Sequence, residues 1–394
     1  MPLPNSTIDS SSATATGQAP KPKGWYTRAA VILLDSVVLL VVLNLVLYVI
    51  MRRGSATKPQ TPQISEQLQK AYPGWREQDL KTLLHETSAV DTYEYEPFTG
   101  FREMPFRGEF VNVDPAGFRL SKNQAPWPPR PQTINVFVFG GSTAFGFGLA
   151  DDETIASYLQ ELAATAQSSP SLAVYNFARP AYFSSQERIL FEQLLNAGFV
   201  PQVAIFVDGV NDFMFAEGPL FGNRFSNFMA GRAGSSTFAN VPMIRAAHWL
   251  RARGMKAPPQ NVPRIDDPTL LQGVMQRWLA NKRMIEVTAS GYGVRPIFVW
   301  QPVPTYQYDL RYHLLFHSEK GFEEYAQRCK YGYPIVENLW AQGKLGPDFL
   351  WLADLQQDKR ENLYVDALHY NAAFSKEIAA RIYGSLSQPS GTHN

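Results

Sequence analysis

Residues 134–143 read INVFVFGGST, a nearly continuous apolar run that ends in two glycines and a serine. A short apolar run without polar alternation is typical of a strand buried on both faces, as in a parallel sheet. The glycines allow the backbone to turn tightly where the strand ends. We therefore expect the hydroxyl of Ser142 at the carboxyl edge of a parallel sheet, where open α/β sheets bind their ligands.

The sequence beyond this stretch alternates between apolar runs and helical periodicity. Four more strands are predicted, at residues 173–176, 203–207, 296–300 and 349–352. Helices are predicted from about Asp152, from Ser184 and from Asn371, because apolar residues recur there at three- and four-residue spacing. Ser184 and Glu187 are expected to form a capping box, and Gly198 is expected to end that helix. Alternating strands and helices predict an α/β fold with a parallel sheet covered on both faces.

Residues 29–51 form an apolar run with a single charged residue, Asp35. At ~1.5 Å per residue this run is long enough to cross ~30 Å of hydrocarbon, and it is longer than the apolar region of a signal peptide. It predicts one uncleaved transmembrane helix. Equal numbers of basic residues precede and follow the run, so charge does not set its orientation. We expect the large C-terminal domain outside the cell, because long domains translocate largely regardless of charge. Asp35 and Asn44 could contact a partner inside the membrane. Alternatively, Asp35 lies near the membrane end and its carboxylate reaches the interface.

The sequence predicts the following division of the chain. Residues 1–28 are a disordered tail, 29–51 the transmembrane helix, 52–68 a linker, 69–131 an irregular, hairpin-like lead-in packed on the next domain, 132–386 the α/β domain, and 387–394 a tail. Within the α/β domain, residues 213–290 are too many for one crossover and form an insertion. Its first part, 213–231, is rich in aromatic residues and is interpreted as a lid or as core packing. Residues 268–287 are interpreted as an ordinary covering helix.

Composition excludes several classes of protein. Lys and Arg total 36 and Asp and Glu total 35, so the net charge of +1 gives no footprint for nucleic acid. The single cysteine, Cys329, cannot form an intrachain disulfide, and no Cys/His cluster has zinc spacing. We therefore expect no metal and no organic cofactor. A phosphate-binding loop is excluded as well, because Phe147 stands where such a loop needs lysine.

Polar residues follow the third and fifth predicted strands as well as the first. Asn211 comes after the third strand, and its amide could donate to a developing oxyanion. Asp366 and His369 come after the fifth strand, three residues apart. A carboxylate there can hold the Nδ1–H of the imidazole while Nε2 faces the serine. Each feature also has a plain structural reading: glycine and asparagine favour turns, and a lone histidine is often a surface or capping residue.

Taken in order, these blocks resemble those of the SGNH/GDSL hydrolase family. Residues 140–142, Gly-Gly-Ser, are similar to the family's Gly-Asp-Ser block, with glycine in the place of aspartate. Residues 209–212 match Gly-x-Asn-Asp, and residues 366–369 match Asp-x-x-His. Residues 176–182 stand for the second block, with Ala181 where the family has glycine. The resemblance covers about residues 132–386 and implies a three-layer α/β/α, flavodoxin-like fold.

The resemblance also implies residue roles. Ser142 would be the nucleophile, His369 its general base, and Asp366 the carboxylate that orients the imidazole. The expected oxyanion site includes the backbone N–H of Ser142 together with Asn211, Ala181 and Gly209. The alanine at position 181 can keep the backbone donor only if its φ suits a residue with a Cβ.

The expected function is a membrane-anchored serine esterase that cleaves or transfers an acyl group, from a carbohydrate O-acetyl ester or a lipid ester. One alternative is an O-acyltransferase acting on cell-envelope polysaccharide. The other is a non-catalytic envelope assembly or scaffold protein that kept the fold. The expected partners are an ester or acylated glycan and the membrane, through residues 29–51, with no nucleic acid. The expected location is the cell membrane, with the catalytic domain extracytoplasmic. The aromatic segment 213–231 would suit sugar stacking and acyl-chain binding equally well.

Overall fold

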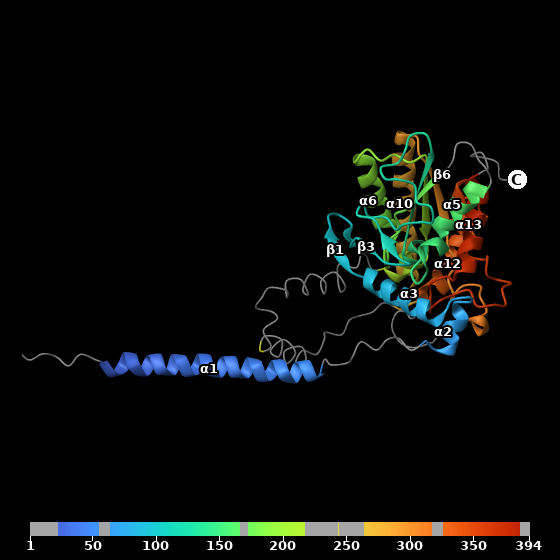
Figure 1. Cartoon of the computed structure of the whole chain (residues 1–394). Coiled ribbons are helices and arrows are strands. Elements are labelled where there is room, and N and C mark those ends of the chain that lie inside the picture. Colours follow the sequence, from blue (N-terminus) through green and yellow to red (C-terminus); the bar gives the residue numbers. More distant parts are fainter. Residues whose placement is uncertain are drawn as a thin grey trace, which may run out of the picture. The chain divides into compact units, whose positions relative to one another are not determined.

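The computed structural model describes residues 23–54, 64–165, 172–216, 243, 264–316 and 326–386 (Figure 1). The chain forms two compact units. One comprises Met1–Pro59 with Ala230–Pro258, and the other comprises Gln60–Met229 with Pro259–Asn394.

The first unit contains a long apolar helix, α1 (Lys23–Gly54). Its segment Gly24–Tyr48 is long and apolar enough to cross a membrane, and none of its most apolar window is buried against protein. Among the described residues it is the one helix of this kind, and a signal sequence near an N-terminus would have the same properties. The helix begins at Lys23, inside the predicted tail, and contains the whole of the predicted span 29–51.

The second unit is built on a five-stranded parallel sheet. Its strands are β5 (Ile134–Gly140), β6 (Leu172–Asn176), β7 (Val203–Asp208), β8 (Arg295–Trp300) and β9 (Phe349–Trp351). They lie in the order β6-β5-β7-β8-β9, and every neighbouring pair is parallel. This is the flavodoxin-like order, in which the connections change direction between β5 and β7. The predicted fold class is confirmed, and each predicted strand agrees with an observed strand to within one residue at either end.

Successive residues of β5 point into two different cores, as a strand buried on both faces requires. Val136 and Val138 pack into an aliphatic core, whereas Phe137 and Phe139 pack into an aromatic one. On the aromatic side, the ring of Phe139 stacks on Phe206 of β7 at 4.9 Å between centroids. Strand β5 therefore contributes side chains to both cores of the domain.

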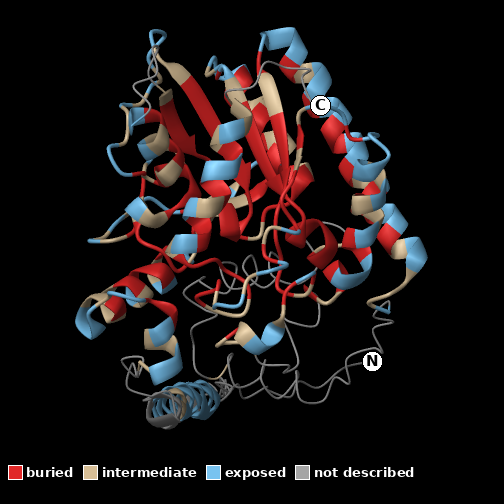
Figure 2. Cartoon of the chain, turned by 90° about the vertical axis from the view of Figure 1, so that its right-hand side faces the viewer, coloured by how far each residue is buried: buried red, intermediate tan, exposed pale blue. Residues whose placement is uncertain are grey.

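Helices cover both faces of the sheet and complete three layers. The main covering helices are α5 (Ile155–Thr165), α6 (Ser184–Asn196), α10 (Pro268–Tyr292), α12 (Arg328–Ala341) and α13 (Ala372–Leu386). Apolar side chains of α5 and α13 belong to the aliphatic core, and those of α6, α10 and α12 belong to the aromatic core. Figure 2 shows the buried strands between helices whose outer sides are exposed.

The predicted helix starts are confirmed in part. Asn371 accepts the N–H of Phe374 at 2.9 Å and so caps α13, and Gly198, at φ +85°, ends α6. The predicted capping box of α6 was wrong. Its N-cap is Phe183, which makes no side-chain cap hydrogen bond, and the Ser184 hydroxyl instead donates to Asp212 at 2.6 Å.

Residues 64–131 are more regular than predicted. They contain two helices, α2 (Glu66–Ala71) and α3 (Glu77–Val90), and two hairpins, β1 (Tyr93–Glu96) with β2 (Gly100–Glu103) and β3 (Phe106–Arg107) with β4 (Asn112–Val113). Leu80, Leu83 and Val90 of α3 belong to the same aliphatic core as α5 and α13. This N-terminal region, residues 64–131, is thus built into the α/β domain, and the helical spacing of its leucines could have predicted α3.

The predicted insertion is described only at its two ends. Phe213 and Met214 lie in the aromatic core, and α10 is the covering helix that the sequence predicts. The proposed lid falls mostly on residues 217–263, which lie outside the described residues apart from residue 243. Most of both predicted tails and of the predicted linker also lie outside them.

Glu86 of α3 holds the N-terminal region together through its carboxylate. This carboxylate is buried and accepts three backbone N–H groups, from Glu109 at 2.7 Å, Phe110 at 2.8 Å and Val111 at 3.0 Å. Replacing Glu86 by alanine leaves these donors without their acceptor. We expect Glu86→Ala to lower the free energy of unfolding by about 2–4 kcal/mol.

Chemical denaturation of the full-length protein in detergent, followed by tryptophan fluorescence, measures this loss. The matched control is Glu94→Ala, which removes a glutamate from a partly exposed ion pair with Arg102 and should cost less than about 1 kcal/mol. Equal losses in the two variants would contradict the role assigned to Glu86.

Candidate active site

Ser142 begins the short helix α4 (Ser142–Phe145), directly after β5. The residue before it, Gly141, lies against the side chain of Asn211. A Cβ at position 141 would come within 2.1 Å of the Asn211 amide nitrogen, so only glycine fits there. The glycine therefore allows the nucleophile loop to approach the loop after β7 closely.

Ser142 and His369 are joined by a hydrogen bond across the carboxyl edge of the sheet. The distance from Ser142 Oγ to His369 Nε2 is 2.8 Å, and His369 Nδ1 lies 2.6 Å from Asp366 Oδ2. Because an ionised carboxylate can only accept, the ring proton lies on Nδ1 and leaves Nε2 free to accept from the serine. The structure thus brings together the three residues that the sequence placed after the first and fifth strands.

The Asp366 carboxylate is held by the turn that carries the histidine. Its Oδ1 accepts the backbone N–H groups of Leu368 at 2.8 Å and His369 at 2.7 Å. Burial raises the pKa of Asp366, but the attraction of His369 and these hydrogen bonds outweigh it, so the pKa lies below its usual value. With 44% of the side chain exposed, the loss of solvation is incomplete. Asp366 is therefore ionised at neutral pH and can stabilise a positive charge on the imidazole.

Asn211 lies on α7 (Val210–Met214) and is buried next to the nucleophile loop. Its Nδ2 donates to the backbone carbonyl of Tyr182 at 2.6 Å. A primary amide has two N–H donors, so one remains for a ligand. The bond to Tyr182 also connects Asn211 with the second sequence block, which contains Ala181.

Ala181 has a φ of +63°, in the left-handed region that glycine favours. An alanine there costs of order 1–2 kcal/mol, so the loop keeps a glycine-like conformation against the preference of its residue. The backbone N–H of Arg179 in the same loop donates to Gly140 at 2.9 Å and ties the loop to the end of β5. Within the described residues, no acceptor is found for the backbone N–H of Ser142 or of Ala181, which leaves both available to a ligand.

Gly209 was expected to take part in the oxyanion site, but its N–H is already used by another group. Its backbone N–H faces the carboxylate of Asp212 and favours the ionised form of that group. A Cβ at position 209 would lie 2.6 Å from the hydroxyl of Tyr333, and the φ of +135° also requires glycine. Gly209 shapes the turn into α7, and of the two residues it is Asn211 that has a donor left for a ligand.

Three neighbours of the site were missed by sequence reasoning as site residues. Thr143 donates to Gln301 at 2.5 Å behind the nucleophile, and the ring of Phe147 lies 4.8 Å from the ring of His369. Gln301 follows the carboxyl end of β8, so the rule that ligands bind at strand ends could have identified it. Phe147 was considered only as a residue that excludes a phosphate loop.

Three buried carboxyl groups lie near Asn211 and α7: Glu187, Asp208 and Asp212. Burial, together with the charges of the two aspartates, raises the pKa of Glu187 well above its usual value. Burial and the charge of Asp212 raise the pKa of Asp208 to about 8. The pKa of Asp212 is also raised by burial, although Arg277 and the Ser184 hydroxyl lower it in part. Asp208 is therefore largely protonated at neutral pH. Among the described residues, no group of three or more His, Cys, Asp or Glu side chains has the geometry to hold a metal ion.

Comparison with known proteins gives matches to solved structures only. Neither a scan against protein-family models nor a comparison with curated proteins finds a match. One matching structure is a protein assigned to the G-D-S-L lipolytic family from Desulfitobacterium hafniense DCB-2. It is 12% identical, with a TM-score of 0.36, over 64% of this chain and 99% of that one.

Two further matches are described as esterases. The psychrotrophic esterase EstA from a Pseudoalteromonas species is 13% identical over 64% of this chain and 96% of that one, with a TM-score of 0.33. The acetyl xylan esterase AlAXEase is 11% identical over 64% of this chain and 100% of that one, with a TM-score of 0.36. The chemistry of the present chain is inferred from its own residues.

The raised pKa of Asp208 predicts how the free energy of unfolding depends on pH. The folded protein holds a proton on this group up to about pH 8, whereas the unfolded chain releases it near pH 4. The folded state therefore binds more protons in this window, and the free energy of unfolding should fall as pH rises from about 5 to 8. Asp208→Asn cannot titrate and keeps an acceptor for the Trp278 N–H, which lies 2.9 Å from Asp208, so we expect a flatter profile.

Denaturation of the full-length protein in detergent, repeated at several pH values, measures the profile. Asp309→Asn is the matched control, because Asp309 pairs with Arg311 at the surface and its pKa is lowered by that contact. It should leave the slope between pH 5 and 8 unchanged. An equal slope in wild type and Asp208→Asn would show that Asp208 carries no proton in the folded state.

Proposed function

We propose that this protein is a serine ester hydrolase of the SGNH/GDSL type, which acts through an acyl-enzyme. The observation that carries the proposal is the hydrogen-bonded chain from Ser142 to His369 to Asp366, with distances of 2.8 and 2.6 Å. A nucleophile, a base and an orienting acid in this order form the arrangement that activates a serine hydroxyl. The flavodoxin-like strand order and the positions of the sequence blocks at the strand ends support the same family.

In the first half of the reaction, Ser142 Oγ attacks the ester carbonyl carbon. His369 Nε2 takes the hydroxyl proton, and Asp366 stabilises the imidazolium that forms. His369 then gives the proton to the leaving alcohol as the C–O bond of the ester breaks. The acyl group remains on Ser142 as an ester.

The negative charge on the carbonyl oxygen would be held by three donors. They are the free Nδ2–H of Asn211 and the backbone N–H groups of Ser142 and Ala181. Removing one oxyanion donor costs about 10²–10³ in kcat in enzymes where it has been measured. The fixed position of Asn211, set by its bond to Tyr182, lets its amide act without reorganisation.

In the second half, His369 removes a proton from water, which attacks the acyl carbon. The bond between that carbon and Ser142 Oγ then breaks, His369 returns the proton to Oγ, and the acid is released. A sugar hydroxyl in the place of water would make the protein an O-acyltransferase by the same steps. We place the hydrolase first, because the residues described serve either acceptor and water is always present. A non-catalytic scaffold role is disfavoured, since it would not need the serine, histidine and aspartate in one hydrogen-bonded chain.

We further propose that α1 anchors the protein in the cell membrane as a single span, with the α/β domain extracytoplasmic. The length and apolar character of Gly24–Tyr48 support the span. An enzyme held there meets acylated glycans of the cell envelope and lipid esters. These are the substrate classes that we propose.

The reactivity of Ser142 tests the proposal directly. We expect a fluorophosphonate probe to label the full-length protein in detergent and to leave Ser142→Ala unlabelled, because an activated serine attacks the phosphorus. Labelling is read by gel fluorescence, and intact tryptophan fluorescence shows that the variant is folded. Labelling that persists in Ser142→Ala, or that is absent from the wild type, would refute the proposed nucleophile.

The oxyanion role of Asn211 gives a separate prediction. Asn211→Ala should lower kcat for a nitrophenyl ester by about 10²–10³, with a much smaller change in KM. The matched control is Asn135→Ala, which removes an equally buried asparagine at the amino end of β5 and should leave kcat per folded molecule unchanged. If Asn211→Ala loses stability but keeps its kcat, Asn211 is a turn residue.

A further inference from the structure

Residues 145–149 follow the nucleophile on α4. They contact both Ser142 and His369, between which the proposed proton transfer takes place. The backbone N–H groups of Gly146 and Phe147 both donate to the carbonyl of Ser142, each at 3.0 Å. The ring of Phe147 lies against the ring of His369. A shift of this loop would therefore move the serine and the histidine together.

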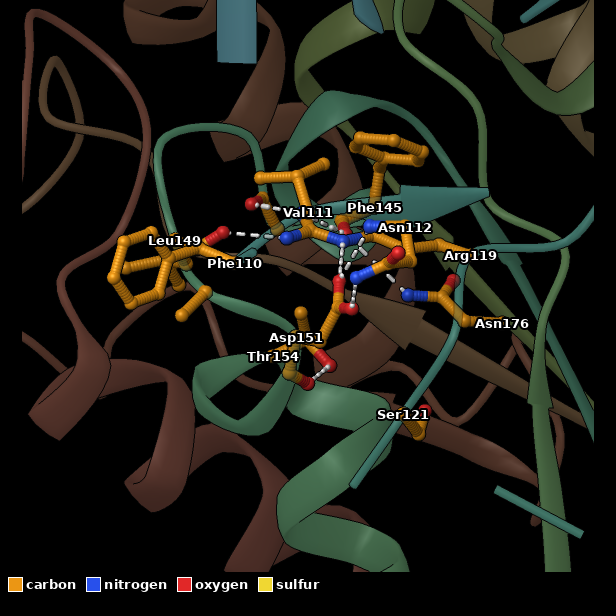
Figure 3. Close-up of polar contacts among 12 residues, drawn as sticks. Phe110, Val111, Asn112, Arg119, Ser121, Phe145, Leu149, Asp151, Thr154 and Asn176 are labelled. Atoms are coloured by element: carbon orange, nitrogen blue, oxygen red, sulfur yellow. Dashed lines mark hydrogen bonds and ion pairs between the residues drawn. The ribbon is translucent and has the colours of Figure 1, made fainter. Parts of the chain in front are cut away.

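Arg119 holds this loop from the N-terminal region. Its guanidinium donates to the carbonyls of Phe145 at 3.0 Å, Gly146 at 2.5 Å and Leu149 at 2.5 Å. Its Nε donates to Asp151 at 3.1 Å (Figure 3). One planar cation thus fixes three carbonyls of a single loop.

The arginine is itself held in place by Asp151. Only 1% of its surface is exposed, so water does not compete for the carbonyls that it binds. Asp151 accepts from the backbone N–H of Asn112 at 3.1 Å and from its side-chain amide at 2.8 Å. The position of the guanidinium is therefore set by the β3–β4 hairpin, which precedes the nucleophile strand in sequence.

A second residue of the N-terminal region contacts the same loop. The Tyr72 hydroxyl, just after α2, donates to the carbonyl of Gly148 at 2.9 Å. A Cβ at Gly148 would lie 3.0 Å from Val365, the residue before the catalytic aspartate. The loop is thus enclosed between the N-terminal region and the turn that carries Asp366 and His369.

We propose that Arg119 is a positioning residue of the active site, which holds residues 145–149 so that Ser142 and His369 stay in hydrogen-bonding distance. The inference rests on the proposed serine hydrolase function and adds a residue outside its sequence blocks. The arginine acts through the loop, whose carbonyls it binds. Its loss should lower the rate of the chemical step more than the binding of substrate.

Kinetics on full-length protein in detergent test this role. We expect Arg119→Met to lower the fluorophosphonate labelling rate and the kcat for a nitrophenyl ester by about 10²-fold, with little change in KM. Arg119→Lys keeps one cation and should fall between this variant and wild type. The matched control is Arg295→Met, which removes an arginine paired with Asp348 at the amino end of β8 and should keep the wild-type rate.

Tyr72→Phe covers the case in which Arg119→Met does not fold. It removes one hydrogen bond to the same loop, keeps the ring, and should slow labelling several-fold. Wild-type rates in folded Arg119→Lys and Tyr72→Phe would overturn the positioning role while leaving the hydrolase intact. A wild-type protein that is not labelled at all would instead overturn the proposed function, and this inference with it.

Discussion

A strand that is buried on both faces can meet solvent only at its two ends, and the rest of this domain depends on that constraint. The side chains of β5 alternate between an aliphatic and an aromatic core, so no polar group is placed along its length except Asn135 near its start. Chemistry is therefore confined to the loops after the strands. Because β5 and β7 are adjacent and parallel, their loops meet at one edge and bring Ser142 close to Asn211.

The loops at that edge are held by polar contacts as well as by apolar side chains, such as Phe145 and Leu149, that belong to the cores. Gly141 leaves room for the Asn211 amide, which donates to the Tyr182 carbonyl. The Asp366 carboxylate accepts the backbone N–H groups of Leu368 and His369. A further set of contacts comes from a part of the chain that precedes the sheet, through Arg119 and Tyr72. The N-terminal region is thus part of the same structural unit as the site.

Sequence reasoning identified what depends on local pattern. The five strands were readable because each is a short apolar run, and Ser142, Asn211, Asp366 and His369 were readable because each follows such a run. The fold class and the strand ends were therefore predictable. Helix α3 was missed although its leucines have helical spacing, because the proline- and glycine-rich residues around it suggested irregular structure.

Other features could not be read because they depend on distant partners. Arg119 lies in a segment without a motif, and its role is defined by carbonyls some thirty residues away. Ser184 has the sequence of a helix cap, but Asp212 lies close enough to take its hydroxyl. Gly209 matches the family block, yet its N–H faces Asp212. For Ser184 and Gly209, a tertiary contact competes with the local pattern and prevails.

The aliphatic core joins the two ends of the domain: Leu80 and Leu83 of α3 share it with Phe374 and Ile378 of α13. Such contacts between residues far apart in sequence raise the contact order, and a high contact order slows folding. During synthesis the N-terminal helices can pack against α5 and the first strands, but this core is complete only when α13 has been made. Until then part of its apolar surface is uncovered, and uncovered apolar surface favours aggregation.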